Sequence, residues 1–178
     1  MAQFIDASSI TEFFRTGFQH TAWRLEARRE YQVDYESERY ETFLRGEDPG
    51  IKGREGWLGA IQEITGRGLR VERARLFDEP PTDYQRFLLW GTGHTVAAGE
   101  DIRYLTRASS EEIGLPARDF WLFDSRVLGE FRYDGDRSLG MELTEDPVEV
   151  LAGCQIRDVA WHYAIRYEEF KARVPSRV

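Results

Sequence analysis

An apolar stripe near the C-terminus constrains the fold more than any other feature of the sequence. Asp146 can cap a helix, and Pro147 stands at the first helical position, where its fixed φ favours a helix start. Apolar residues then recur every three or four positions: Val148, Ala152, Ile156, Val159, Ala160, Tyr163, Tyr167 and Phe170. This spacing predicts one long C-terminal helix that ends before Pro175 and packs its apolar face against the rest of the fold.

A run of strands is predicted before that helix. Residues 120–123 are all apolar, which is typical of a central strand that is buried on both faces. Strands are also expected at 102–105 and 127–133. The Asp-Gly pair within residues 134–137 predicts a hairpin turn, because glycine readily adopts the positive φ that such a turn needs. The core face of the returning strand is expected to consist of Leu139, Met141 and Leu143.

The first half of the chain mixes helices and strands. Strands are expected over 21–33, half-buried, and over the basic segment 69–77. Helical spacing predicts helices at 11–18, 36–46, 57–65 and 82–90. The first is expected to begin with a capping box of Ser9 and Glu12. The last is expected to begin at Thr82 or Asp83 and to end at Gly-Thr-Gly-His, residues 91–94.

These elements together predict an α+β (mixed α/β) fold. We expect a central sheet of about five to six strands, flanked by helices, with the long helix at the C-terminus. The length of 178 residues favours a single domain over residues 1–178. The alternative is a minor lobe over residues 1–50, before the Gly- and Pro-rich loop.

Composition narrows the class of protein. The net charge of −8 argues against a surface that binds nucleic acid throughout, so no direct nucleic-acid partner is expected. No apolar run approaches the roughly 20 residues of a membrane span, and the N-terminus lacks the pattern of a secretory signal. The single cysteine, Cys154, excludes an internal disulfide. We therefore expect a soluble, acidic cytoplasmic protein without a membrane partner.

The basic residues are almost all arginine. Of the 24 basic residues, only Lys52 and Lys171 are lysine. Such a skew is expected where GC-rich codons are favoured, so the sequence indicates a high-GC bacterial host.

The sequence contains no motif of a known catalytic or metal site. His20, His94 and His162 fall in three different predicted elements, so no metal site or cofactor is expected. Cys154 and His162 lie eight residues apart on one predicted helix, about 12 Å at 1.5 Å per residue, which is too far for a nucleophile and its base. No Gly-x-Ser-x-Gly or phosphate-loop pattern is present. We therefore assign no catalytic residue from the sequence.

Two arginines on the basic strand are candidates for anion binding. Arg73 and Arg75 share a parity with Val71 and Phe77, so both guanidinium groups are expected on the inward face, where they can line a cleft. An Arg pair of this kind can hold a phosphate. The alternative is a salt-bridged rim of the core.

Two aspartates are candidates for acid–base roles. Asp101 follows a run of small residues, and Asp124 follows the buried strand 120–123, so the two can converge at an edge of the sheet. The alternative is that each aspartate accepts hydrogen bonds from the backbone at the end of a strand.

Several segments resemble an uncharacterised actinobacterial family, a domain of unknown function that is encoded beside helix-turn-helix regulators of the sporulation-control type. The similar segments are FQHTAWRLE at 18–26, RAR at 73–75, PTDYQRF at 81–87, VAAGEDIR at 96–103, DFWLFD at 119–124 and YDG at 133–135. The resemblance implies a cytoplasmic accessory protein in a transcriptional control module.

The second half also resembles a phospholipase D-like half-domain. The chemistry of that superfamily depends on His-x-Lys, whereas Gly50 and Glu169 stand two residues before the two lysines of this chain. The resemblance therefore implies a fold without its catalytic motif, in which an anion pocket lined by Arg73, Arg75 or Arg103 remains.

Two functions are consistent with these observations. The first is a non-catalytic regulatory module that binds a helix-turn-helix transcription regulator and a small anionic ligand. The second is an enzyme or sensor for a phosphorylated or nucleotide-like small molecule. In the second, Arg73, Arg75 or Arg103 would hold the anion, and Asp101 or Asp124 would serve as acid or base.

Overall fold

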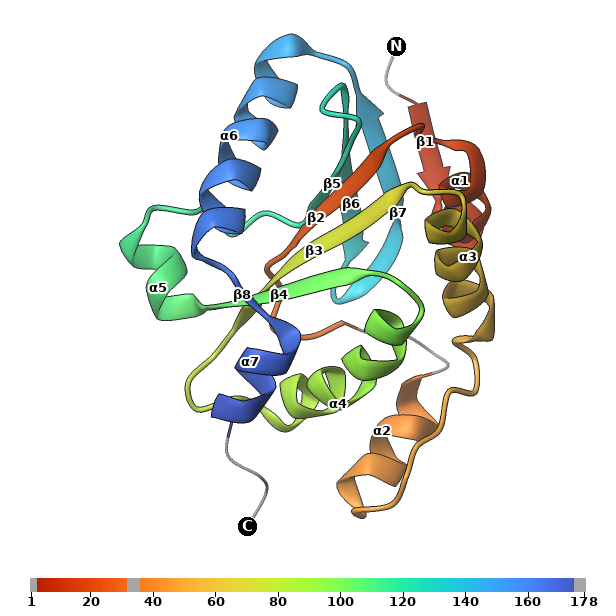
Figure 1. Ribbon diagram of the computed structural model, residues 1–178, viewed down its shortest axis with the longest axis vertical. Coiled ribbons are helices and arrows are strands. Elements are labelled where there is room, and N and C mark those ends of the chain that lie inside the picture. Colours follow the sequence, from red (N-terminus) through yellow and green to blue (C-terminus); the bar gives the residue numbers. More distant parts are fainter. Residues whose placement is uncertain (1–2, 32–35, 175–178) are drawn as a thin grey trace.

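The protein is built on one mixed β-sheet, seen in a computed structural model that describes residues 3–31 and 36–174 (Figure 1). Within these residues the sheet has eight strands, in the order β1-β7-β6-β5-β2-β3-β4-β8. Neighbouring strands in β2-β3-β4 are parallel, and all other neighbours are antiparallel. The strands are β1 (Gln3–Asp6), β2 (Thr21–Glu26), β3 (Arg70–Phe77), β4 (Asp101–Thr106), β5 (Phe120–Phe123), β6 (Val127–Asp134), β7 (Arg137–Thr144) and β8 (Ile165–Arg166).

Helices pack against both faces of the sheet (Figure 1). One face is covered by α1 (Ile10–Thr16), α3 (Glu55–Gly66), α4 (Asp83–Ala97) and α7 (Tyr167–Arg173), with α2 (Ser37–Leu44) against α4. The opposite face is covered by α6 (Pro147–Tyr163) and the region of α5 (Arg107–Glu112). We call the face under α3 and α4 the α3/α4 face. None of the helices in the described ranges is long and apolar enough to cross a membrane.

The mixed α+β class is confirmed, but the predicted size of the sheet is wrong. The sheet has eight strands rather than five to six, because two short edge strands escape the sequence pattern. β1 has four residues, three of them exposed, so it shows no apolar alternation. β8 has only two residues and pairs with β4 through Arg103–Arg166 and Tyr104–Ile165.

The prediction of one long C-terminal helix is only partly confirmed. α6 begins after the Asp146 cap as expected but ends at Tyr163, and Ala164 is extended. The chain then forms β8 at the edge of the sheet and continues as α7. Val150 and Ala160 of α6 pack on one face of the sheet, whereas Tyr167 and Phe170 of α7 pack on the α3/α4 face. The helical spacing of apolar residues therefore continues in the sequence although the helix is interrupted. At the interruption, the chain crosses at the edge of the sheet from one face to the other.

The predicted end of the helix at residues 91–94 is wrong, because α4 continues through both glycines to Ala97. The predicted start is confirmed, since Thr82 and Gln85 form a capping box. Both glycines lie where another side chain comes close. A Cβ at Gly91 would lie 2.9 Å from Nη1 of Arg54, and one at Gly93 would lie 3.1 Å from the hydroxyl of Tyr167.

The second strand also differs from its prediction. β2 ends at Glu26 rather than at residue 33, and both of its faces are largely buried. Residues 32 and 33 of the predicted strand lie outside the described residues. The predicted capping box at the first helix is not formed, because the Ser9 side chain makes no cap hydrogen bond. The hairpin at 134–137 is confirmed, with Gly135 at φ 59° and Asp134 paired with Arg137.

Candidate functional site

A row of charged side chains crosses the middle of the α3/α4 face. Arg24 and Glu26 lie on β2, and Arg73 and Arg75 lie on β3, where alternate residues share a face. The parallel register places Arg24 beside Arg73 and Glu26 beside Arg75. Along β3, the two arginines separate Val71, in the apolar cluster under α1 and α3, from Phe77, in the cluster under α4 and α7. Charged residues therefore occupy the region between two apolar cores.

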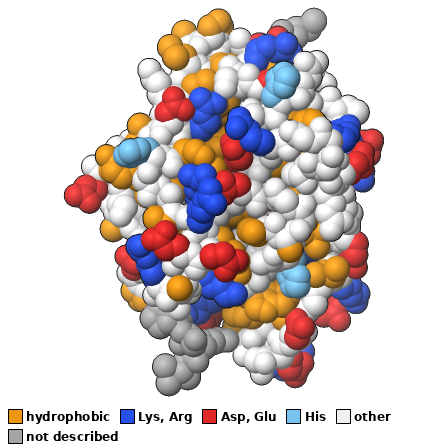
Figure 2. All heavy atoms as spheres, viewed as in Figure 1, with side chains coloured by type: hydrophobic (Ala, Val, Ile, Leu, Met, Phe, Trp, Pro, Cys, Tyr) orange, Lys and Arg blue, Asp and Glu red, His pale blue; other side chains and the backbone are white. Residues whose placement is uncertain are grey.

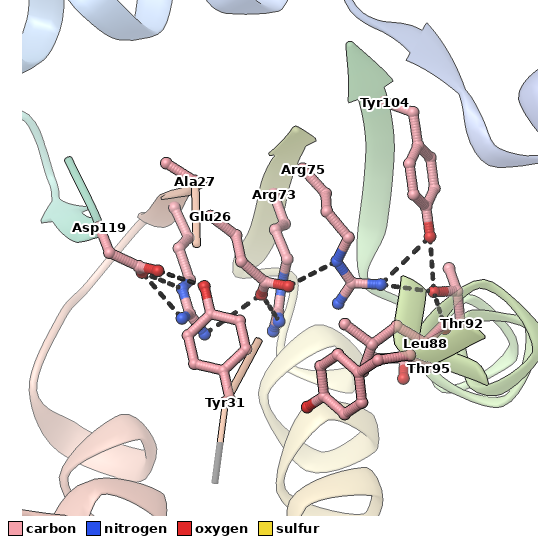
Figure 3. A network of polar contacts seen from close by, with 12 residues as sticks. Glu26, Ala27, Tyr31, Arg73, Arg75, Leu88, Thr92, Thr95, Tyr104 and Asp119 are labelled. Carbon is pink, nitrogen blue, oxygen red and sulfur yellow. Dashed lines mark hydrogen bonds and ion pairs between the residues drawn. The ribbon is translucent and has the colours of Figure 1, made fainter. Parts of the chain in front are cut away.

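Glu26 is the centre of this row. Its carboxylate lies 2.6 Å from Nη1 of Arg73, 2.6 Å from Nε of Arg75 and 3.4 Å from Nη1 of Arg24 (Figure 3). Burial alone would raise the pKa of Glu26, but the charges of Arg75, Arg24 and Arg73 outweigh it and hold the pKa well below its usual range. Glu26 is therefore an anion that three guanidinium groups share.

Further partners fix the three guanidinium groups in place. Nε of Arg73 lies 2.7 Å from Glu100, and Nη2 of Arg24 lies 2.8 Å from Asp119, which also accepts a hydrogen bond from Tyr31. Nη1 of Arg75 donates to Thr92 at 2.9 Å and to the hydroxyl of Tyr104 at 3.1 Å (Figure 3). Each of the three guanidinium groups is therefore held by at least two partners.

A cavity of about 290 Å³ adjoins this row. The charged side chains in its wall are Arg24, Arg39, Arg54, Arg73, Arg75, Glu26 and Glu36. The aromatic rings in its wall are Tyr31, Trp57, Tyr84, Phe87, Trp121, Phe131 and Tyr133. Five guanidinium groups and two carboxylates in one wall, within a chain of net charge −8, make this cavity a locally basic site in an acidic protein.

Several donors in the wall have no hydrogen-bond partner among the described residues. Arg73 and Arg75 each keep one nitrogen, Nη2, without a partner, although their side chains are only 10% and 9% exposed. The Oγ of Ser138 is buried without a partner as well. Because accessible guanidinium nitrogens form strong charge-assisted hydrogen bonds to oxygen acceptors, the cavity is suited to a ligand rich in such acceptors.

Arg54 adds a cation from a different element. It stands immediately before α3, and its guanidinium donates to the Gly91 carbonyl at 3.0 Å and to Thr95 Oγ1 at 2.6 Å, both on α4. Within the described ranges, no carboxylate lies within 4.0 Å of this guanidinium. Burial, and then the positive charge of Arg39, lower the pKa of Arg54. A bound anion would offset this repulsion.

Glu36 differs from Glu26 in its surroundings. The hydroxyl of Tyr84 donates to Glu36 at 2.9 Å. Burial raises the pKa of Glu36, and the opposing effects of Tyr84, Arg54 and Arg39 are smaller. The wall therefore contains one carboxylate whose pKa is lowered and one whose pKa is raised.

The structure brings together two of the five residues predicted to bind an anion. Arg73 and Arg75 line the cavity, and they also form the salt-bridged network that the alternative predicted. Arg103 lies beside Ala74 in the register of β3 and β4, on the opposite face of the sheet. There it pairs with Asp101 at 3.0 Å and lies 3.8 Å from the ring centre of Trp161.

Asp124 lies apart from the cavity, in the turn after β5. Its carboxylate accepts backbone hydrogen bonds from Gln19, His20 and Thr21, each at 2.8 Å, and so joins β5 to the start of β2. These backbone donors outweigh burial and lower the pKa of Asp124. Asp124 therefore accepts backbone hydrogen bonds, as the alternative predicted. It does not converge with Asp101, which pairs with Arg103.

Sequence reasoning missed the remaining charged residues of the wall: Arg24, Glu26, Glu36, Arg39 and Arg54. Arg24 and Glu26 alternate with Trp23 and Leu25, which is also the pattern of a strand with one face in solvent. One available signal was the spacing of Arg54 and Trp57, which places both side chains on one face of the first turn of a helix. No group of three or more metal-ligating side chains occurs in the parts of the chain that the structure describes.

The fold and the cavity define an α+β protein with a buried, arginine-lined site on one face of a mixed sheet. The chain belongs to the family described as domain of unknown function (DUF6879), whose model matches residues 8–172. No curated protein matches the chain.

Proposed function

We propose that this protein is a non-catalytic regulatory module that binds a small anionic ligand in the arginine-lined cavity and acts through a protein partner. One observation carries the proposal. Two guanidinium groups that are nine-tenths buried keep unpartnered nitrogens beside the cavity, and Arg54, which has no carboxylate within 4.0 Å among the described residues, lies in the same wall. An anion with several oxygens would satisfy these donors, since charge-assisted hydrogen bonds to guanidinium are strong.

The chemistry of Glu26 favours binding over catalysis. A general base needs a pKa near the working pH, whereas three guanidinium groups hold the pKa of Glu26 far below it. Asp119 and Glu100, which lie next to the wall, are likewise paired with arginines at 2.8 and 2.7 Å. These carboxylates orient the arginines and so prepare the cavity for an anion.

Thermal unfolding tests the ligand part of the proposal. Inorganic phosphate is compared with chloride at equal ionic strength, because a ligand that binds only the folded state raises the unfolding temperature. We expect phosphate to raise it in the natural protein and to raise it less in Arg54→Gln. Arg45→Gln is the matched control, since Arg45 is exposed and pairs only near the surface. Equal effects of phosphate and chloride on the natural protein would contradict anion binding.

We propose a helix-turn-helix transcription regulator as the partner, in an actinobacterial cytoplasm. The resemblance to proteins encoded beside such regulators and the net charge of −8 support this, because an acidic protein is complementary to a basic DNA-binding one. On the face seen in Figure 2, acidic and basic side chains are interspersed, which is unlike an extended basic surface for DNA. Size-exclusion chromatography with light scattering, on this protein mixed with the adjacent regulator, is expected to give a complex, and separate elution would contradict it.

We also propose that residues 1–178 form one domain with the architecture of a phospholipase D-like half-domain. Strands β1 and β2, from the segment before residue 50, lie in the same sheet as β3 and β4, which supports one domain over a separate lobe. The sequence has no His-x-Lys, so the reaction of that superfamily does not come with the architecture. In this reading Arg73 and Arg75, without Arg103, form the remaining anion pocket.

A second candidate function is an enzyme or sensor that acts on a phosphorylated or nucleotide-like molecule. Glu36 favours it, because two carboxylates whose pKa values are shifted in opposite directions are typical of acid–base pairs. Turnover of phosphate esters by the natural protein that is lost in Glu36→Gln, with phosphate binding retained, would favour the enzyme over the regulatory module.

A further inference from the structure

We infer that the ligand of the cavity is a nucleoside monophosphate, with its phosphate at Arg73, Arg75 and Arg54 and its base against Trp57. This inference rests on the anion-binding function proposed above and adds the class of ligand. Two regions of the cavity wall support this inference, one suited to the phosphate and one suited to the base.

The cationic region is suited to a phosphate rather than to a carboxylate. The partnerless Nη2 atoms of Arg73 and Arg75 come from neighbouring positions on one face of β3, and Arg54 adds a third guanidinium from the start of α3. Arg54 and Arg75 lie against the same part of α4, because Arg54 donates to Gly91 and Thr95 and Arg75 donates to Thr92. A phosphate monoester presents three oxygens in different directions, whereas a carboxylate presents two in one plane. Three guanidinium groups on two elements therefore match the phosphate.

Trp57 is suited to the base. It follows Arg54, the N-cap residue of α3, by three residues, and both side chains line the cavity. Guanidinium groups already lie over the rings of Trp121, Phe131 and Phe87, whereas none among the described residues lies over Trp57. The edge contact with Phe14, at 5.1 Å between ring centres, and the tilted contact with Trp121, at 6.4 Å, hold the indole in place. An aromatic ring positioned in this way can stack on a planar base.

The size of the cavity limits the ligand. Its volume of about 290 Å³ lies at the lower end of the range of small-molecule pockets, about 300 to 1,000 Å³. A volume this small suits a single nucleotide better than a dinucleotide. Ser138, whose Oγ is buried without a partner, adds a polar group for the sugar or the base.

Isothermal titration calorimetry on the full chain tests the inference. The probes are the monophosphates of adenosine, guanosine, cytidine and uridine, together with ribose 5-phosphate, adenosine and inorganic phosphate. We expect at least one nucleoside monophosphate to bind about tenfold or more tightly than ribose 5-phosphate, as base stacking on an aromatic ring can provide. Arg54→Gln should weaken all phosphate compounds alike. Trp57→Leu should remove the preference for the nucleotide and leave ribose 5-phosphate binding within about threefold.

Two further variants separate this result from a loss of folding. Trp57→Phe keeps an aromatic ring and should retain part of the preference. Trp161→Leu removes an indole from the opposite face of the sheet, where it contacts Arg103, and should retain the whole preference.

Each contrary outcome overturns a defined part of the inference. Equal binding of ribose 5-phosphate and every nucleotide by the natural protein overturns the nucleoside and leaves the anion site intact. A preference that survives in Trp57→Leu overturns the position of the base. Adenosine binding as tight as that of its monophosphate overturns the phosphate site. Binding of no phosphate compound overturns both this inference and the proposed function.

Discussion

Arg54, immediately before α3, lies against Gly91 in the middle of α4. Nη1 of Arg54 donates to the Gly91 carbonyl at 3.0 Å, and a Cβ at residue 91 would lie 2.9 Å from that nitrogen. Glycine inside a helix is less favourable than alanine by about 1 kcal/mol, so its presence in the middle of α4 opposes local stability. Here the missing side chain leaves room for the guanidinium that faces the cavity.

Gly91→Ala should therefore separate binding from stability. The clash falls on the end of a flexible side chain, so Arg54 can shift, and the gain in helix propensity should keep the free energy of unfolding within about 1 kcal/mol of the natural value. The displaced guanidinium should weaken the stabilisation by phosphate, which thermal unfolding with and without phosphate measures. Gly59→Ala is the control, because nothing lies within 4 Å of its added Cβ, and it should leave the phosphate effect unchanged.

Glu26→Gln should strongly destabilise the protein. The neutral amide would leave Arg24, Arg73 and Arg75 without the anion that they share, and breaking a buried ion pair typically costs about 3–5 kcal/mol. Urea unfolding at neutral pH measures the change. In Glu38→Gln, which removes an exposed carboxylate paired with Lys52, stability should change little. Equal stability of the two variants would show that the buried network contributes nothing.

The fold was predictable where a pattern lies within one segment. The apolar strand β5, the Asp-Gly hairpin and the helix start at Thr82 depend on neighbouring residues, and all three are confirmed. The break between α6 and α7 was not predictable, because Tyr167 and Phe170 continue the helical spacing of α6 while packing on the other face of the sheet. Periodicity indicates that a residue is buried, but it does not indicate against which face of the sheet the residue packs.

The site was predictable on one strand only. The parity of Arg73 and Arg75 with Val71 and Phe77 indicated an inward face. The same parity on β2 gave no such indication, because Arg24 and Glu26 are charged and their partners lie on other strands and loops. Buried charges that neutralise one another across strands resemble exposed charges when each strand is considered alone. Pairing between distant segments is the information that a single sequence lacks.

Arg103→Gln should leave anion binding unchanged. Arg103 was a candidate from the sequence, but it lies on the face opposite the cavity, between Asp101 and Trp161. The dissociation constant for phosphate, taken from the shift in unfolding temperature, should stay within about twofold of the natural value. A loss as large as that in Arg54→Gln would place the anion on the other face of the sheet.

Asp124→Asn should reduce stability in a pH-dependent way. The carboxylate accepts three backbone hydrogen bonds, and their loss or weakening should cost about 1–3 kcal/mol at neutral pH. The folded pKa lies below the ordinary value of 3.8, so the carboxylate stabilises the fold above that pH and loses this effect as pH falls below it.

Urea unfolding at pH 7 and at pH 3 should therefore show the difference between the natural protein and Asp124→Asn becoming smaller in acid. Asp158→Asn, at an exposed residue paired with its neighbour Arg157, should show little difference at either pH. A difference for Asp124→Asn that stays constant with pH would mean that the carboxylate charge is not what stabilises this turn.

Anion affinity should rise as pH falls, because Glu36 shares the cavity with the anion. The groups that influence its titration are Tyr84 of α4, Arg54 before α3, Arg39 of α2 and Glu26 of β2. Burial has already raised the pKa of Glu36, and a bound anion would raise it further by like-charge repulsion. Binding would then be accompanied by proton uptake, so affinity should increase as pH falls towards the pKa of Glu36 in the bound state.

Sulfate is the appropriate probe for this effect, because its charge stays constant across the range in which a carboxylate titrates. Unfolding temperatures with and without sulfate should show a stronger sulfate effect at pH 5 than at pH 7 in the natural protein, and a weaker dependence on pH in Glu36→Gln. Since Glu38 is exposed and pairs with Lys52 outside the cavity, Glu38→Gln should keep the natural slope. If Glu36→Gln keeps the natural slope as well, Glu36 is too far from the bound anion to interact with it. The anion would then lie beside Arg73 and Arg75 of β3, away from Glu36.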